Sequence, residues 1–117
     1  MALIYHVPQV RLPYRATRYG GFDFSYMFDV SGKLIKPTYE ERSRSGRHGE
    51  DVYELQPGTY YAVVFTRPNG PKRPITITYM RITVSSNETH KEVIRENEVP
   101  EPVLAKAKAI HNRLISG

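Results

Sequence analysis

The sequence contains no cysteine among its 117 residues. This absence excludes a disulfide framework, a thiolate nucleophile and a cysteine-ligated zinc site, so stability must come from packing. No apolar run approaches the roughly 20 residues that a membrane-spanning helix needs, and residues 1–10 lack the apolar stretch of a signal peptide. We therefore expect a cytoplasmic protein that has no membrane partner.

Motifs of catalysis and cofactor binding are also missing from the sequence. There is no G-x-S-x-G elbow, Walker loop or G-x-G-x-x-G fingerprint, and no set of nucleophile, base and oxyanion donor can be assembled. The histidines lie in separate segments, without a second ligand at a recognised spacing: His6, His48, His90 and His111. We predict no catalytic residues, no metal site and no cofactor; an enzyme whose site is formed only by the fold stays an alternative.

What the sequence does contain is typical of a turn-rich β protein, with 9 prolines and 8 glycines between short apolar segments. Aromatic and polar residues alternate over residues 22–30, which predicts a strand with Phe22, Phe24, Tyr26 and Phe28 facing the core. A turn at residues 29–32 and a short strand at 33–36 should complete a hairpin. Residues 59–66 are predicted to form the central strand.

Two later segments also read as strands. The apolar residues of 75–84 change phase at Tyr79 and Met80, which predicts a bulge there. A turn or long hairpin loop at residues 67–74, containing three prolines, should precede this strand. Residues 89–95 are predicted to form an edge strand.

Two regions are expected outside the sheet interior. Residues 2–7 begin an apolar-rich run, but Pro8 and Pro13 then place residues 9–12 at a sheet edge or a strand's end, because proline lacks the amide that a central strand needs. Residues 40–50 contain no apolar anchor and are predicted to form a mobile loop. Order should return at residues 52–55.

A single helix is predicted near the C-terminal end. Pro100 and Pro102 stand at its start, and Glu101 suits the positive end of the helix dipole. Apolar residues then follow helical spacing at Val103, Leu104, Ala107, Ile110 and Leu114. We predict a mostly β fold, an antiparallel sandwich or open barrel over residues 1–98, with an amphipathic helix at 99–117 packed on it or on a neighbouring subunit.

Residues 55–65 read LQPGTYYAVVF. This run resembles the L-x-P-G-T-x-Y-x-V corner of fibronectin type III and related immunoglobulin-like sandwiches, and the likeness extends over residues 52–84. The resemblance implies that Tyr61 is the corner tyrosine whose hydroxyl bonds back to the chain, and that Asn69 and Gly70 lie between the last two strands. It implies an architecture and no function, because sandwich folds host many unrelated activities.

The charge is unevenly distributed. The net charge is +5, and residues 1–87 carry 12 basic and 7 acidic side chains, whereas residues 88–117 carry 5 of each. The whole excess therefore lies on the β-rich part, which indicates affinity for something acidic.

Arginines interleaved with tyrosines are the strongest functional signal. Guanidinium groups suit phosphate oxygens, and tyrosines offer stacking surface to unpaired bases. The candidates fall into three groups: Arg11, Tyr14, Arg15, Arg18 and Tyr19; Arg42, Arg44, Arg47 and His48; and Arg67, Lys72 and Arg73. If these groups share one face, they predict a non-enzymatic module that binds nucleic acid or another acidic surface.

Two alternatives remain open from the sequence. The basic groups could be solvated turns with no partner. The chain could also be a structural subunit that assembles into a filament, shell or larger complex, because a terminal helix and an extended N-terminal segment can be exchanged between neighbours.

Overall fold

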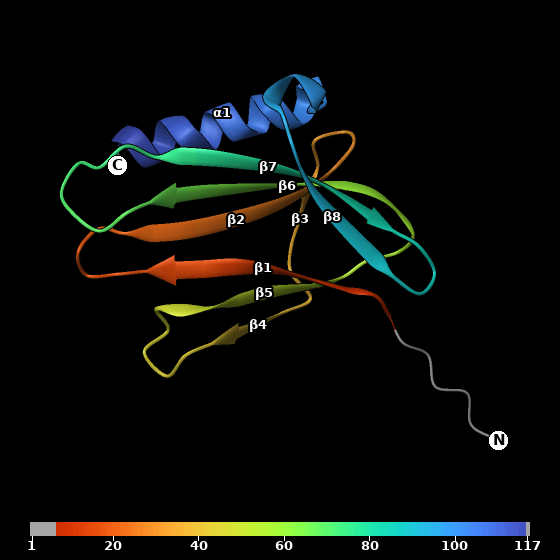
Figure 1. The fold of residues 1–117 in the computed structure, drawn as a ribbon, viewed down its shortest axis with the longest axis horizontal. Coiled ribbons are helices and arrows are strands. Elements are labelled where there is room, and N and C mark those ends of the chain that lie inside the picture. The colour runs from red at the N-terminus through yellow and green to blue at the C-terminus, as the bar shows by residue number, and fades with distance from the viewer. Residues whose placement is uncertain (1–6, 117) are drawn as a thin grey trace.

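The computed structural model describes residues 7–116, which form one antiparallel sheet and one C-terminal helix (Figure 1). The sheet order is β4-β5-β1-β2-β6-β7-β8, with β3 pairing to β2, and β4 and β8 are its two edges. The predicted mostly-β architecture is therefore confirmed. The elements are β1 (Gln9–Ala16), β2 (Phe22–Asp29), β3 (Leu34–Ile35), β4 (Tyr39–Arg42), β5 (His48–Glu54), β6 (Gly58–Arg67), β7 (Thr76–Val84), β8 (Thr89–Ile94), a 3₁₀ turn (Glu96–Glu98) and α1 (Glu101–Ser116).

The predicted hairpin after β2 is confirmed, and its turn is fixed by a side chain. The Asp29 carboxylate accepts hydrogen bonds from the backbone amides of Ser31 at 2.9 Å and Lys33 at 3.0 Å. Gly32 takes a left-handed conformation with φ 84°, which glycine adopts without steric cost. The Ser31 hydroxyl also donates to Asp29, and this bond, together with the two amide bonds, lowers the pKa of the Asp29 carboxyl.

The central strands are buried on both faces. Phe28 and Val63 belong to a core beneath α1, whereas their neighbours Met27 and Ala62 belong to a second core on the opposite face. Since successive side chains of a strand point to opposite faces, β2 and β6 must be covered on both sides. The second core is completed by residues from β1 and the end of β5, including Leu12.

The bulge predicted in β7 is wrong. The β6–β7 register runs without interruption from Gly58 opposite Val84 to Thr66 opposite Thr76. Tyr79 packs against the core beneath α1, while Ile82 is buried in the second core. The change of apolar phase therefore reflects burial of both faces and requires no extra residue.

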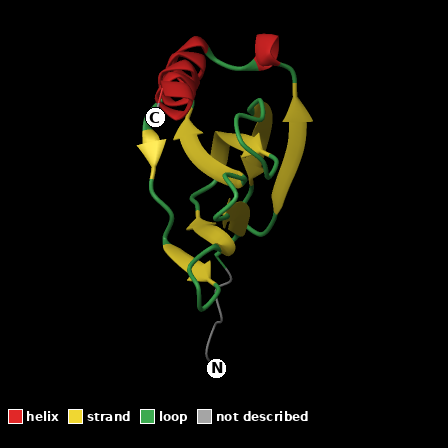
Figure 2. Ribbon diagram, turned by 90° about the vertical axis from the view of Figure 1, so that its left-hand side faces the viewer, coloured by secondary structure: helices red, strands yellow, loops and turns green. Residues whose placement is uncertain are grey.

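The predicted helix is confirmed and packs on the sheet of its own chain (Figure 2). Val103, Ala107 and Ile110 are buried against the face that carries Phe22 and Phe28, the two buried members of the aromatic stripe. Phe24 and Tyr26 are half-buried on the same face, as expected for core residues near its margin. No helix within residues 7–116 is long and apolar enough to cross a membrane.

The expectation that residues 9–12 lie at a sheet edge or a strand's end holds in its second form, because they open β1 and pair with β5 alone, although β1 as a whole lies between β5 and β2. β1 pairs with β5 from Gln9 to Arg15, but it meets β2 only through two residue pairs near their shared turn. Pro13 is tolerated because β1 has one neighbour at that point, and its carbonyl accepts a hydrogen bond from Ser25 Oγ at 2.7 Å. The apolar run at residues 2–6 lies outside the described residues.

Residues 40–50 form a hairpin, so the prediction of a mobile loop is wrong. β4 and β5 pair from Tyr39 opposite Val52 to Arg42 opposite Gly49, which leaves only residues 43–47 as the connecting loop. Polar anchors replace the missing apolar ones: the Arg42 guanidinium lies 3.4 Å from the centroid of the Tyr14 ring and donates to Asp51 at 3.0 Å. An Arg–carboxylate pair stacked on an aromatic ring holds the strand in place.

The sandwich resemblance assigned the wrong tyrosine to the back-bonding role. Tyr60 donates its hydroxyl to the Gln56 carbonyl at 2.8 Å, while the Tyr61 ring is buried beneath α1. Asn69 and Gly70 lie between β6 and β7, which are followed by β8, so that they do not join the last two strands. The hydrogen bond back to the chain therefore comes from Tyr60.

Candidate functional site

Three loops meet at one end of the sheet. The register places Phe22 opposite Arg67, and Arg15 opposite both Asp23 and His48, so residues 17–21, 43–47 and 68–75 all follow or precede strands at that end. Figure 1 shows the β1–β2, β4–β5 and β6–β7 connections on the same side of the molecule, opposite the remaining turns. The three basic groups thus have members at one end, which the sequence could not show.

Direct hydrogen bonds hold these loops together. The Ala16 amide donates to the Arg47 carbonyl at 2.7 Å, and the Gly70 amide donates to the Tyr19 carbonyl at 2.9 Å. Thr17 Oγ1 bridges two loops, because it donates to Asn69 Oδ1 at 2.7 Å and accepts from the Gly21 amide at 3.0 Å. The relative positions of the loops are therefore set by the fold.

The three loops carry positive charge without compensation. Residues 17–21, 43–47 and 68–75 contain no aspartate or glutamate. Five exposed cations lie on them, none with an ion pair inside residues 7–116: Arg18, Arg44, Arg47, Lys72 and Arg73. We call these five residues and Tyr19 the basic end. All five lie at the same end of the sheet, where their positive charge attracts anions.

Tyr19 gives the basic end an accessible aromatic ring. Its exposed fraction is 65%, and the Arg18 guanidinium carbon lies 5.9 Å from the ring centroid. An exposed ring beside a cation can stack on a nucleobase while the cation contacts a phosphate.

Two predicted arginines are held in ion pairs outside the basic end. Arg11 donates to Glu41 at 2.6 Å and lies 3.5 Å from Glu50, and the hydrogen bond from Arg11 lowers the pKa of Glu41. Arg15 donates to Asp23 at 3.2 Å and to the Arg67 carbonyl. Both side chains join separate strands through carboxylates, so they are not free cations like the five exposed ones.

Tyr14 and Arg42 contact one another and serve the fold. The Tyr14 ring lies beneath the Arg42 guanidinium and 5.9 Å from the Phe24 ring, so its stacking surface is already occupied. Arg42 in turn pairs with the buried Asp51. Burial raises the pKa of Asp51, and Arg42 opposes that rise.

A pocket beside the basic end was missed by the sequence predictions. It has a volume of about 540 Å³ and lies between the β6–β7 loop and the end of α1. It is lined by Arg67, Lys72, Arg73, Pro74, Ile75, His111 and Ile115. Arg67, Lys72 and Arg73 were grouped by their spacing, but nothing in the sequence shows that the helix end lies against them.

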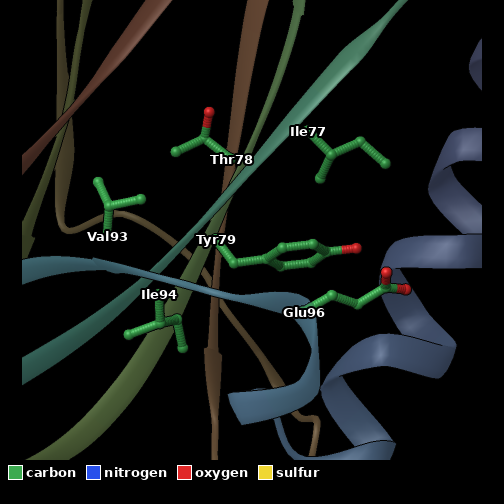
Figure 3. A pocket seen from close by; sticks show the side chains of 6 residues that line it. All are labelled: Ile77, Thr78, Tyr79, Val93, Ile94 and Glu96. Carbon is green, nitrogen blue, oxygen red and sulfur yellow. The ribbon is translucent and has the colours of Figure 1, made fainter.

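A second pocket, of about 470 Å³, lies where β8 ends beside β7 (Figure 3). Within residues 7–116, β8 pairs with β7 only from Tyr79 onward, so Thr76, Ile77 and Thr78 have no neighbouring strand on that side. The Tyr79 ring points along the pocket toward Glu96, and burial together with this carboxylate raises the pKa of Tyr79.

The described histidines do not form a metal site. Across residues 7–116 no three histidine, aspartate or glutamate side chains are grouped closely enough to hold an ion. His48 and His90 are exposed on β5 and β8, and His111 stacks on Phe65 with ring centroids 6.3 Å apart. His6 lies outside the described residues.

No family model, curated protein or solved structure matches this chain. The basic end and the two pockets must therefore be interpreted from their own chemistry.

Proposed function

We propose that this chain is a non-enzymatic cytoplasmic module that binds nucleic acid through the basic end. The observation that carries the proposal is the convergence of five exposed cations, with no carboxylate on their loops, at one end of the sheet. Phosphates of a polynucleotide repeat at short, regular intervals, so several can be neutralised together by cations on adjacent loops.

Tyr19 supports nucleic acid, and single strands in particular, over another acidic surface. An acidic protein surface needs cations alone, whereas unpaired bases also gain from an aromatic ring on which they stack. Tyr19 is the exposed ring of the basic end and lies against Arg18. The expected partner is therefore a single strand whose backbone follows the three loops.

Fluorescence anisotropy of a labelled oligothymidylate tests the proposal. Five phosphate contacts predict that log K falls with log salt with a slope of about −3.5, or roughly 100-fold between about 50 and 200 mM salt. Absence of binding at low salt, or binding that salt leaves unchanged, would contradict an electrostatic site.

A matched pair of double variants locates that site. Arg44→Gln with Arg47→Gln removes two charges from the basic end, and should reduce the slope by about 1.4 and weaken binding at least tenfold at low salt. Lys33→Gln with Lys36→Gln removes the same charge from the opposite end and should leave the slope unchanged. Equal effects of the two pairs would show that net charge, rather than the basic end, governs binding.

Self-association is a second candidate, favoured by the unpaired part of β7. A strand from a second copy could pair with Thr76–Thr78 and cover the apolar side chains of the adjacent pocket, including Ile77 and Ile94. Light scattering as a function of concentration tests this candidate. It predicts a dimer or larger species that is lost on Thr78→Pro, because proline cannot donate to an added strand; a monomer at all concentrations would contradict it.

A further inference from the structure

Arg67 in the 540 Å³ pocket has no anionic partner, unlike the other half-buried arginines. The described residues include five such arginines, and four of them pair with a carboxylate: Arg11, Arg15, Arg42 and Arg81. Arg67 has no ion pair within residues 7–116, and its Nε is buried without an acceptor. The Arg67 guanidinium carbon lies 5.0 Å from the centroid of the Phe22 ring, but an aromatic face does not replace a counterion, so a bound anion would complete its surroundings.

The neighbouring loop holds two more cations in a constrained geometry. Lys72 and Arg73 stand between Pro71 and Pro74, which fix the backbone on either side. Lys72 has a left-handed φ of 55°, the only positive φ found at a described residue other than glycine. Strain of this kind persists where the surrounding structure enforces it and is concentrated at binding sites. Both cations line the pocket with Arg67.

The rest of the lining is apolar apart from His111. Pro74, Ile75 and Ile115 line the pocket. Ile115 lies on the last turn of α1 and has an exposed fraction of 61%, so its side chain is accessible to a ligand. The imidazole of His111 is held against the Phe65 ring at an interplanar angle of 19°. The pocket thus joins a cationic wall to an apolar wall, and its volume is within the range of about 300–1,000 Å³ usual for small ligands.

A nucleotide at the end of a strand fits both walls. A terminal phosphate carries about −1.5 to −2 charges, more than the single charge of an internal phosphodiester, and so matches three cations better. Its base would lie against Ile75 and Ile115. We infer that this pocket binds the terminal phosphate and end base of a single-stranded nucleic acid, an inference that rests on the proposed function.

The test compares one oligothymidylate in three forms, with a 5′-phosphate, with a 3′-phosphate and with hydroxyl groups at both ends. Binding is measured by anisotropy at the same salt concentration. We expect one of the phosphorylated forms to bind about tenfold more tightly than the unphosphorylated form. This gain is expected from charge-assisted hydrogen bonds to the terminal phosphate. Equal affinity of all three forms would overturn the inference.

Variants separate the pocket from the remainder of the basic end. Lys72→Asn removes the charge but keeps a residue that tolerates positive φ, so the fold should be retained while the tenfold preference is lost. Arg44→Gln with Arg47→Gln should weaken all three forms and keep the preference. Lys36→Asn, at the opposite end, should keep both. Retention of the preference in Lys72→Asn would contradict the pocket assignment.

The two proposals fail in different ways. Strong, salt-sensitive binding without a preference for a terminal phosphate overturns the pocket and leaves the proposed function intact. Adenosine monophosphate and adenosine, titrated by NMR, test the pocket without a strand: shifts at Arg73, Ile75 and His111 that appear with adenosine monophosphate and not with adenosine would show a phosphate site there, so that a failure of oligonucleotide binding beside them would count against the proposed function. Identical responses to the two compounds, or none, count against the pocket.

Discussion

The two ends of the sheet differ in how their loops are used. The loops of the basic end carry five exposed cations and no carboxylate, and they are tied to one another by backbone hydrogen bonds and by Thr17. The turns of the opposite end, at residues 30–33, 36–38, 55–57 and 85–88, carry only Lys33, Lys36 and Glu88. One end accumulates charge, and the other end does not.

At the opposite end, side chains and glycine fix the path of the chain. Asp29 orders its turn, Tyr60 bonds back to Gln56, and Gly32 lies against Pro102 at the start of α1. These contacts bury or satisfy the groups that make them and leave little to recognise a partner. The two ends differ because connections between antiparallel strands fall at either end of the sheet, which separates the basic loops from the turns that side chains and glycine fix.

A glycine-to-alanine substitution made once at each end should give the largest difference in the free energy of unfolding. Gly32→Ala combines a left-handed φ of 84° with a Cβ only 2.8 Å from Pro102. Strain and overpacking together should lower the free energy of unfolding by about 3 kcal/mol. Gly46→Ala, in the β4–β5 loop, meets no atom within 4 Å at φ 72° and should cost about 1 kcal/mol. Urea denaturation measures both; equal losses would contradict the division between the ends.

Arg42→Gln tests whether this arginine belongs to the fold rather than to the basic end. It leaves the buried Asp51 without its cation, so it should destabilise the protein by about 2 kcal/mol at neutral pH while the salt slope of binding stays unchanged. Combining it with Asp51→Asn should recover most of that loss. A reduced salt slope in Arg42→Gln would place Arg42 in the binding site instead.

The pH dependence of Arg42→Gln has a defined sign. The pKa of Asp51 is raised in the folded protein, so the folded state takes up a proton at higher pH than the unfolded state, and stability falls as pH rises between the two pKa values. Without Arg42 the pKa of Asp51 rises further. The destabilisation by Arg42→Gln should therefore shrink as the pH is lowered from about 7 to about 4 in urea titrations; a constant or growing loss would contradict this linkage.

Tyr19→Ala should remove base stacking without removing charge. We expect about tenfold weaker binding of oligothymidylate, within the range of about 1–3 kcal/mol for one stacked base, and an unchanged salt slope. Tyr19→Phe should bind like the parent. Tyr39→Ala, which removes a less exposed ring at the opposite end, is the matched control and should not affect anisotropy. Parent-like binding by Tyr19→Ala would exclude the stacking role.

The smallest effect is expected from Thr17→Val. It removes the hydroxyl that joins the β1–β2 and β6–β7 loops and should cost about 1 kcal/mol of stability. Looser loops should weaken binding about twofold, whereas Tyr60→Phe, which removes a hydroxyl bond at the opposite end, should cost similar stability and leave binding unchanged. A twofold change in both variants would mean that global stability, rather than loop position, affects binding.

β-Branched and aromatic residues were sufficient to predict β6 as the central strand, and period-two alternation was sufficient to predict β2. It failed for the β4–β5 hairpin, whose anchors are the polar residues Arg42 and Asp51. The alternation also led to a wrong prediction for β7. There the change of apolar phase comes from burial of both faces, and a bulge would produce the same pattern. Sequence periodicity reports burial on one face, and these segments depend on ion pairs or on two cores.

The candidate site was predictable by composition but not by position. Arg18, Arg44 and Lys72 were selected for their charge, yet their convergence depends on a strand order that periodicity does not contain. The same criterion selected Arg11 and Arg15, because a sequence does not show which arginines face a carboxylate. His111 and Ile115 reach the pocket only because α1 runs back toward the basic end.

The most direct test of the account is a ¹H–¹⁵N correlation spectrum recorded during titration with an oligothymidylate at low salt. If the basic end binds nucleic acid, the chemical shifts of the amides of Arg18, Tyr19, Arg44, Arg47 and Lys72 should change on titration. These changes should be reversed when salt is added. Amides of Ser31, Lys33 and Asn87 at the opposite end should not move. Shifts concentrated at those three residues, or no shifts at all, would contradict the claim that the basic end binds nucleic acid.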